Sequence, residues 1–206
     1  MPFQTLELPG AMLHLDTEFL TPERATHFQR LLRATLPWRQ RQVTIAGISY
    51  DEPRLTAWHG ETYSYSGLTL DPAPLTPELD ELRLLIQTQL GNAGIAAAPF
   101  NSVLANLYRA RRRDSIGMHA DDEPELGFEP VIASLSLGRP AQLRLAPKPG
   151  SQGKPARVLL RPGSLFIMAR QTQANWKHGI DKEARPSSED RINLTFRTIF
   201  PRKRPS

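Results

Sequence analysis

The chain has 206 residues, a length that suits one domain with a substantial core rather than two well-packed domains. It has no cysteine, which excludes disulfides, thiolate metal sites and cysteine nucleophiles, so a metal must be held by His, Asp or Glu. The net charge is +5, and 21 of the 26 basic residues are arginines, whose planar donor groups suit phosphates and carboxylates. The charge favours an anionic partner, with plain solvated surface as the alternative.

Two amphipathic helices are predicted in the first 100 residues, over 21–37 and 76–91. A Thr-Pro pair opens each segment, as is typical of a helix N-terminus, and Pro37 and Gly91 are expected to end them. Apolar residues at helical spacing predict one buried face on each helix. These residues are Phe28, Leu31, Leu32 and Leu36 in the first helix, and Leu79, Leu82, Leu85, Ile86 and Leu90 in the second.

From residue 101 onward the pattern changes to short apolar or alternating runs separated by turn residues, which predicts a β-sandwich or barrel. The expected fold is α+β and β-rich, a double-stranded β-helix of the jelly-roll, cupin-like kind with the two helices packed outside. The expected strands lie within 102–109, 114–120, 131–138, 141–147, 156–160, 164–169, 176–180 and 191–200.

Three candidate metal ligands lie on predicted strands. His119 and Asp121 are two residues apart, so on an extended segment both project to the same side. His178 follows on another strand. Two histidines and one carboxylate form the ligand set of non-haem Fe(II) oxygenases, which leaves three positions open on the metal. A His-x-Asp pair alone is weak evidence, because many chains of this length contain one by chance.

The last predicted strand, RINLTFR, places two arginines on one face. A solvated sheet surface is the simple explanation. If this face lines a narrow barrel, a buried guanidinium is costly unless an anion neutralises it. A keto diacid such as 2-oxoglutarate satisfies that need, with one end on the metal and the far carboxylate on an arginine. Residues of the inward face would be Arg191, Asn193, Thr195 and Arg197, with Asn106 and Tyr108 on a shared face of another strand as further hydrogen-bond partners.

The run NLYRARRRDSIGMHADDE, the later His178 and RINLTFR, in this order, resemble the AlkB family of Fe(II)- and 2-oxoglutarate-dependent nucleic-acid demethylases. PRLTAWHGETYSYSGLTL resembles the substrate-binding region of the animal DNA- and RNA-repair members, and the likeness covers residues 43–200. The resemblance implies iron ligation by His119, Asp121 and His178. It implies 2-oxoglutarate contacts from Asn106, Tyr108, Arg191, Asn193 and Arg197.

The activity implied is repair of 1-methyladenine and 3-methylcytosine in DNA, with RNA left open, using Fe(II), O2 and 2-oxoglutarate and releasing succinate, carbon dioxide and formaldehyde. A methylated base reaches a buried metal only from a single strand or after flipping. The single domain, 1–206, would then comprise helices and nucleotide-recognition hairpins in 1–100 and the jelly-roll core in 101–200. Expected substrate contacts are Arg54, Tyr63, Tyr65 and Glu123, with Arg111, Arg112 and Arg113 on the nucleic-acid backbone. Ordinary strand packing is the alternative for the tyrosines.

The hairpin near QVTIAGISY departs from the duplex-acting relatives, because Ala46 is a poor wedge between stacked bases. Single-stranded or transiently opened substrates are therefore favoured, unless Ile45 or Ile48 takes that role. Alternatives for the whole chain are a 2-oxoglutarate-dependent hydroxylase or demethylase of a protein or small molecule, and a non-catalytic nucleic-acid-binding module. Without a membrane span or a leader pattern, we expect a cytoplasmic monomer.

Overall fold

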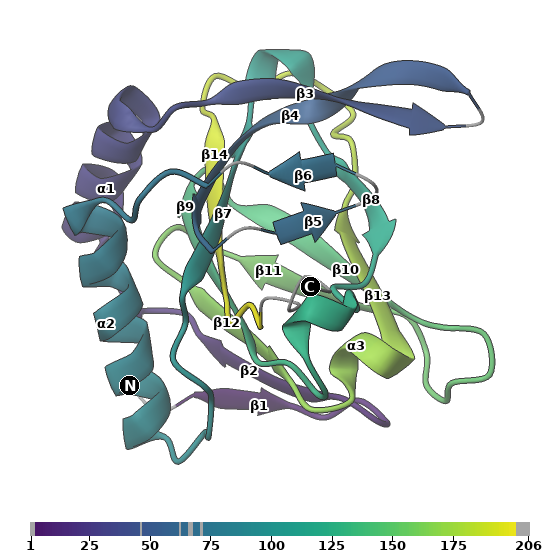
Figure 1. Ribbon diagram of the computed structural model, residues 1–206. Coiled ribbons are helices and arrows are strands. Elements are labelled where there is room, and N and C mark those ends of the chain that lie inside the picture. The colour runs from purple at the N-terminus through teal and green to yellow at the C-terminus, as the bar shows by residue number, and fades with distance from the viewer. Residues whose placement is uncertain (1–2, 46, 62, 66–67, 71, 201–206) are drawn as a thin grey trace, which may run out of the picture.

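The computed structural model of the chain describes residues 3–45, 47–61, 63–65, 68–70 and 72–200 (Figure 1). Within this part, an eight-stranded and a four-stranded sheet form the body of the molecule. The helices α1 (Pro22–Thr35) and α2 (Pro77–Asn92) lie along one flank of the larger sheet, joined by an ion pair between Arg24 and Glu81. This is the strand-rich α+β jelly-roll with two outer helices that the sequence predicts.

The large sheet has the order β1-β2-β12-β9-β14-β7-β4-β3, and its neighbouring strands are antiparallel. Four of its strands, β1 to β4, come from the first 100 residues, and β1 and β2 were not predicted. The bounds in sheet order are Gln4–Leu6, Met12–Asp16, Leu165–Ala169, Ile132–Gly138, Arg191–Arg197, Ser102–Tyr108, Ile48–Gly60 and Arg39–Ile45.

The small sheet has the order β11-β10-β13-β8 and carries two of the three candidate metal ligands. Its bounds are Ala156–Leu160, Ala141–Pro147, Trp176–Ile180 and Ile116–His119. A separate hairpin pairs β5 (Tyr63–Tyr65) with β6 (Leu68–Leu70). One-turn helices follow three of the strands: η1 (Ala110–Arg112), η2 (Pro124–Leu126) and α3 (Thr172–Asn175).

The alternation of β14 decides which side chains enter the space between the sheets. Ile192, Leu194 and Phe196 belong to the apolar core that the large sheet shares with α1 and α2. A second apolar core includes residues of both sheets, among them Phe166 of β12 and Leu145 of β10. The polar residues of β14 therefore lie on the face that looks away from the helices, and all of them are buried. The solvated-surface explanation for the two arginines is wrong.

The two long helices follow the sequence pattern closely. Thr21 and Thr76 cap their first turns by accepting hydrogen bonds from the backbone N–H groups of Arg24 and Leu79. The second helix continues through Gly91 to Asn92, one residue beyond the predicted end. Leu31 and Leu85, predicted to be buried, are only partly buried, because they lie at the edges of their apolar faces. Across the described residues, no helix combines the length and apolarity that a membrane crossing requires.

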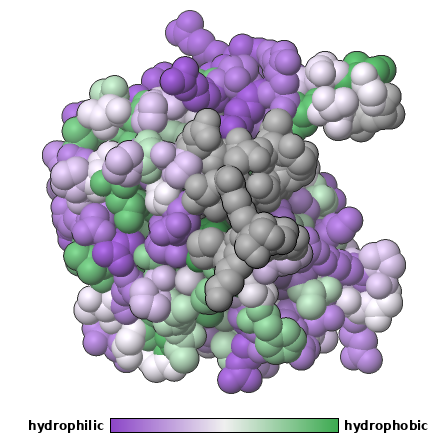
Figure 2. Space-filling view, viewed as in Figure 1, coloured by the Kyte–Doolittle hydropathy of each residue, from purple (hydrophilic) through white to green (hydrophobic). Residues whose placement is uncertain are grey.

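Strands β3 and β4 extend beyond the body as a two-stranded arm (Figure 1). Near its tip, hydrophobic surface lies beside surface of neutral hydropathy (Figure 2), and Ile48 and Tyr50 are 57% and 49% exposed. Of the side chains considered as a wedge, Ala46 and the side chain of Ile45 lie outside the described residues. Ile48 remains as an exposed apolar side chain at the tip.

Candidate metal centre and anion pocket

The two histidines of the predicted metal site are held opposite each other by strand pairing. His178 of β13 pairs with His119 of β8, and their ring centroids are 4.4 Å apart. Close packing of the two strands depends on Gly179, since a Cβ at this position would lie 2.9 Å from the carbonyl oxygens of Ile116 and Gly117. Strand geometry therefore fixes the separation of the two imidazoles.

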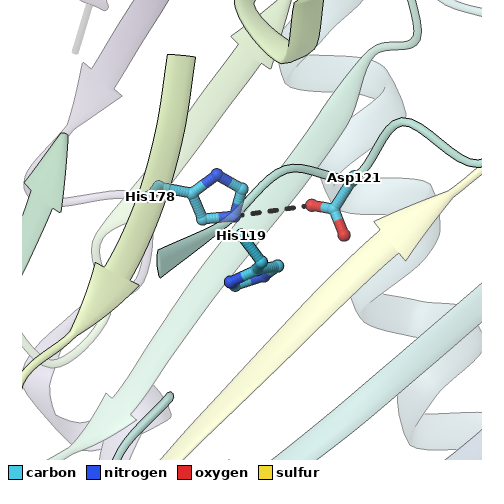
Figure 3. Close-up of side chains that lie close together, drawn as sticks. All are labelled: His119, Asp121 and His178. Atoms are coloured by element: carbon cyan, nitrogen blue, oxygen red, sulfur yellow. Dashed lines mark ion pairs between the residues drawn. The ribbon is translucent and has the colours of Figure 1, made fainter. Parts of the chain in front are cut away.

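Asp121 completes the cluster from the segment that follows β8 (Figure 3). One ligand atom from each of the three residues lies within 4.8 Å of the others, and His178 Nε2 is 3.5 Å from Asp121 Oδ2. His119 Nδ1 lies 2.9 Å from the Gly117 carbonyl oxygen, so this nitrogen carries the proton and leaves Nε2 as the ligand atom. The sequence prediction that these three side chains meet is confirmed by the geometry.

The electrostatics keep His178 and Asp121 in their metal-binding protonation states. Burial lowers the pKa of His178 to about 4, so its imidazole is neutral at physiological pH. Burial alone would raise the pKa of Asp121, but the charge of Arg197 opposes this effect and the pKa is lowered. The Oδ2 atom of Asp121 is buried and has no hydrogen-bond partner in the described part of the chain. A divalent iron fits this donor set, since it would pair that oxygen.

The depressed pKa of His178 predicts that the metal-free protein loses stability as the pH falls from about 6.5 to about 4. In this window the unfolded chain binds the proton and the folded chain does not, which amounts to roughly 3 kcal/mol at the lower limit. Urea unfolding of the wild type and the His178→Asn variant at about pH 7 and pH 5 checks this. The difference in the free energy of unfolding between the two proteins should change with pH. A difference that is the same at both pH values contradicts the prediction.

Two further side chains hold Asp121 in place. Arg197 Nη2 donates to Oδ1, and both side chains are buried, so β14 is tied to the metal cluster by an ion pair. Gln173 of α3 accepts a hydrogen bond from the Asp121 backbone N–H through Oε1 at 2.9 Å and points Nε2 at the sulfur of Met168, 3.5 Å away. Sequence reasoning missed Gln173, because its role depends on a contact across 52 residues.

The Gln173→Leu variant is expected to bind metal about 10- to 100-fold more weakly, since it removes a group that orients a ligand. Co(II) titration followed by absorption spectroscopy measures this affinity without catalysis. Gln171→Leu, an exposed glutamine two residues earlier, is the matched control and should bind as the wild type does. Equal affinity of Gln173→Leu and wild type would show that the helix serves packing alone.

A row of polar residues crosses the large sheet beside the metal cluster. Strand pairing places Arg191 opposite Tyr108 and Asn193 opposite Asn106. The guanidinium of Arg191 lies over the Tyr108 ring, 5.2 Å from its centroid, and its Nη2 donates to Ser136 Oγ at 3.0 Å. Burial lowers the pKa of Arg191 and raises the pKa of Tyr108. Four of the five residues predicted to contact 2-oxoglutarate are thus adjacent, and Arg197 lies at the other end of β14.

Arg191 is the strongest indication of an anionic ligand. It is 1% exposed, and its Nε and Nη1 atoms have no partner among the described residues. A buried guanidinium with two unpaired nitrogens is costly, and an anionic ligand that accepts hydrogen bonds from them would remove that cost. Arg191 and the metal-ligand cluster line one cavity between the sheets, so a diacid held by both would lie inside it. Its lining is Arg54, Leu104, Asn106, Tyr108, Ile116, His119, Asp121, Ser134, Leu143, Leu160, Phe166, Met168, His178, Ile180, Arg191, Asn193, Thr195 and Arg197.

Among the predicted substrate contacts, Arg54 lines this cavity and is buried. Its Nε donates to Asn106 Oδ1 at 2.9 Å, and the Asn106 amide nitrogen donates to the Leu104 carbonyl oxygen at 3.5 Å. Glu123 is partly buried, just before η2. Tyr63 and Tyr65 lie on β5, but their side chains lie outside the part of the structure that is described. Their contacts with substrate remain predictions.

The three arginines predicted to bind phosphate differ in their surroundings. Arg111 and Arg112 are exposed on η1. Arg113 has a left-handed backbone with φ of 55° and donates through Nε to the Glu183 carbonyl oxygen at 2.6 Å. Arg113 therefore holds the loop before β14, and the contacts of all three arginines with nucleic acid remain predictions.

A jelly-roll that encloses two histidines, a carboxylate and a buried arginine defines a class of proteins, the iron-dependent oxygenases that use a keto acid. A family model of the 2OG-Fe(II) oxygenase superfamily matches residues 12–197. Alpha-ketoglutarate-dependent dioxygenase alkB homolog 3 of Homo sapiens is 41% identical over 192 residues, which are 89% of this chain and 64% of that protein. DNA oxidative demethylase ALKBH2 of Mus musculus is 35% identical over 172 residues, 79% of this chain and 69% of that protein.

The solved structure of OsALKBH1 has the same fold, with a TM-score of 0.65 and 19% identity over 93% of this chain and 99% of that one. The chain belongs to the AlkB family within the 2OG-Fe(II) oxygenase superfamily. It spans less than two thirds of the length of the alkB homolog 3 relatives.

Proposed function

We propose that the chain is an oxidative demethylase of N-alkylated bases in nucleic acids, acting on 1-methyladenine and 3-methylcytosine in DNA, and on RNA as a further substrate. The observation that carries the proposal is the buried, partly unpaired Arg191 in one cavity with a complete set of iron ligands. The proposal draws further support from relatives that are named a dioxygenase and a DNA oxidative demethylase.

Separate residues would bind the iron and position its carboxylate ligand. His119, Asp121 and His178 would hold Fe(II), and Arg197 and Gln173 keep the carboxylate in place. When bound, Fe(II) with O2 and 2-oxoglutarate supplies the oxidant that hydroxylates an N-methyl group, and the hydroxymethyl group then leaves as formaldehyde.

Arg191 would bind the far carboxylate of 2-oxoglutarate, with a hydrogen bond from Tyr108, and Asn193 and Asn106 would line the ligand. The Asn193 amide donates to Ser134 Oγ at 2.7 Å and to the Leu135 carbonyl oxygen at 3.3 Å. Burial of the cavity wall excludes bulk water from these contacts, which strengthens them. Arg54, Tyr63, Tyr65 and Glu123 would hold the extruded base, and Arg111, Arg112 and Arg113 would contact the strand outside. We also propose that the protein is a monomer, which gel filtration tests, and that it is cytoplasmic, which cell fractionation tests.

The test is a mass-spectrometric assay of oligonucleotides that carry one 1-methyladenine or 3-methylcytosine, supplied with Fe(II), ascorbate and 2-oxoglutarate. Single- and double-stranded DNA and RNA are compared side by side. The proposal predicts loss of the methyl group together with succinate formation. Absence of both, with a protein that binds metal, would overturn it. Succinate formed only in the presence of a peptide or small molecule would assign the chain to the alternative class of hydroxylases.

A further inference from the structure

A buried carboxylate beside the cavity is not used by the roles given above. Glu52 of β4 is 5% exposed and lies on the same strand face as Arg54, two residues away. Its Oε1 accepts from Arg54 Nη2 at 3.2 Å, and its Oε2 is buried with no partner among the described residues. An unpaired buried carboxylate oxygen is costly, so its presence calls for an explanation other than packing.

The position of the Glu52–Arg54 pair gives that explanation. Arg54 lines the cavity and donates to Asn106, so without Glu52 it would add an uncompensated positive charge to the wall. Burial raises the pKa of Tyr108, the charges of Arg54 and Arg191 lower it, and the charge of Glu52 raises it. The field of Glu52 therefore reaches a side chain of the cavity wall.

Charge matters here because the proposed substrates are cations. Methylation of adenine N1 or cytosine N3 adds a group to a ring nitrogen that has no proton to lose, and leaves the base positively charged. Methylation of uracil N3 replaces a proton and gives a neutral base. A cationic base that enters the cavity is repelled by an unpaired Arg54, whereas a neutral one is affected far less.

We propose that Glu52 is a specificity-determining residue that neutralises Arg54 and so lets the cavity accept cationic methylated bases in preference to neutral ones. This inference rests on the proposed function, since it names the charge class of the substrate at the same site. It concerns binding, so it is tested without turnover.

The experiment measures the affinity of the Fe(II)- and 2-oxoglutarate-loaded protein, without oxygen, for single-stranded oligonucleotides by fluorescence anisotropy. One oligonucleotide carries 3-methylcytosine and the other 3-methyluracil, two bases of nearly the same shape. The wild type should prefer 3-methylcytosine. The Glu52→Gln variant, which keeps the shape and removes the charge, should lower that preference about tenfold through weaker binding of the cationic base.

Two variants act as controls. Glu52→Asp keeps the charge and should retain the preference. Asp51→Asn removes the same charge from the adjacent, exposed position on the opposite face of β4, and should also retain it. Thermal unfolding of each variant confirms that the comparison is made between folded proteins.

The other results would overturn the inference. One such result is a wild type that binds the two oligonucleotides equally well. Another is a Glu52→Gln variant that binds both of them equally more weakly, or neither of them more weakly. Either result shows that the Glu52–Arg54 pair serves the fold alone. Failure of the demethylation assay is a separate result, because the oxygen-free binding ratio still decides the role of Glu52.

Discussion

The Asp121→Ala variant is expected to lose metal binding and also to lower the free energy of unfolding of the metal-free protein by about 3–5 kcal/mol. The first effect follows from the loss of one of three ligands. The second arises because Asp121 is the counter-ion of Arg197, which is 4% exposed and would be left charged and unpaired. Urea unfolding without metal and Co(II) titration measure the two effects separately.

His119→Ala is the matched comparison for this prediction. It removes a metal ligand that is only partly buried and whose Nδ1 atom contacts the Gly117 carbonyl oxygen, so no buried arginine loses its partner. The variant should lose metal binding to a similar extent but cost no more than about 1.5 kcal/mol of stability. If both variants destabilised the metal-free protein equally, the ion pair with Arg197 would not be the cause.

The contribution of the sequence is clearest at β14. Strict alternation over RINLTFR predicts two faces, and the nearby metal-ligand pattern favours the polar face as the lining of the cavity. The pairing of Arg191 with Tyr108, and of Asn193 with Asn106, then follows from an antiparallel register that no local pattern reveals. Helices α1 and α2 were predicted from caps and periodicity, which are local signals.

The features that sequence reasoning missed depend on contacts between distant segments. Strand β2 is short and mixes polar with apolar residues, and it is a strand because it pairs with β12 at the far end of the chain. Gln173 is an ordinary polar residue until the fold brings it to Asp121. Glu52 lies in a polar stretch of a protruding strand and becomes buried only where that strand joins the body. Local propensity carries none of this information.

The Arg191→Met variant is expected to bind 2-oxoglutarate at least about 100-fold more weakly, because it removes the donors that would pair the far carboxylate. The same variant should leave the stability of the ligand-free protein unchanged or raise it by about 1–4 kcal/mol, since it replaces a buried charge with an apolar side chain. A residue that is needed for ligand binding often lowers the stability of the ligand-free protein, so its replacement weakens binding and raises stability.

Calorimetric titration of 2-oxoglutarate without oxygen, and urea unfolding without ligand, test the two halves of this prediction. Arg191→Lys is the informative control, because lysine keeps the charge but lacks the two parallel donors, so its affinity should fall between the wild type and the methionine variant. A methionine variant that is less stable yet binds 2-oxoglutarate normally would show that Arg191 holds the sheet together. In that case no ligand would explain the unpaired Nε and Nη1 atoms.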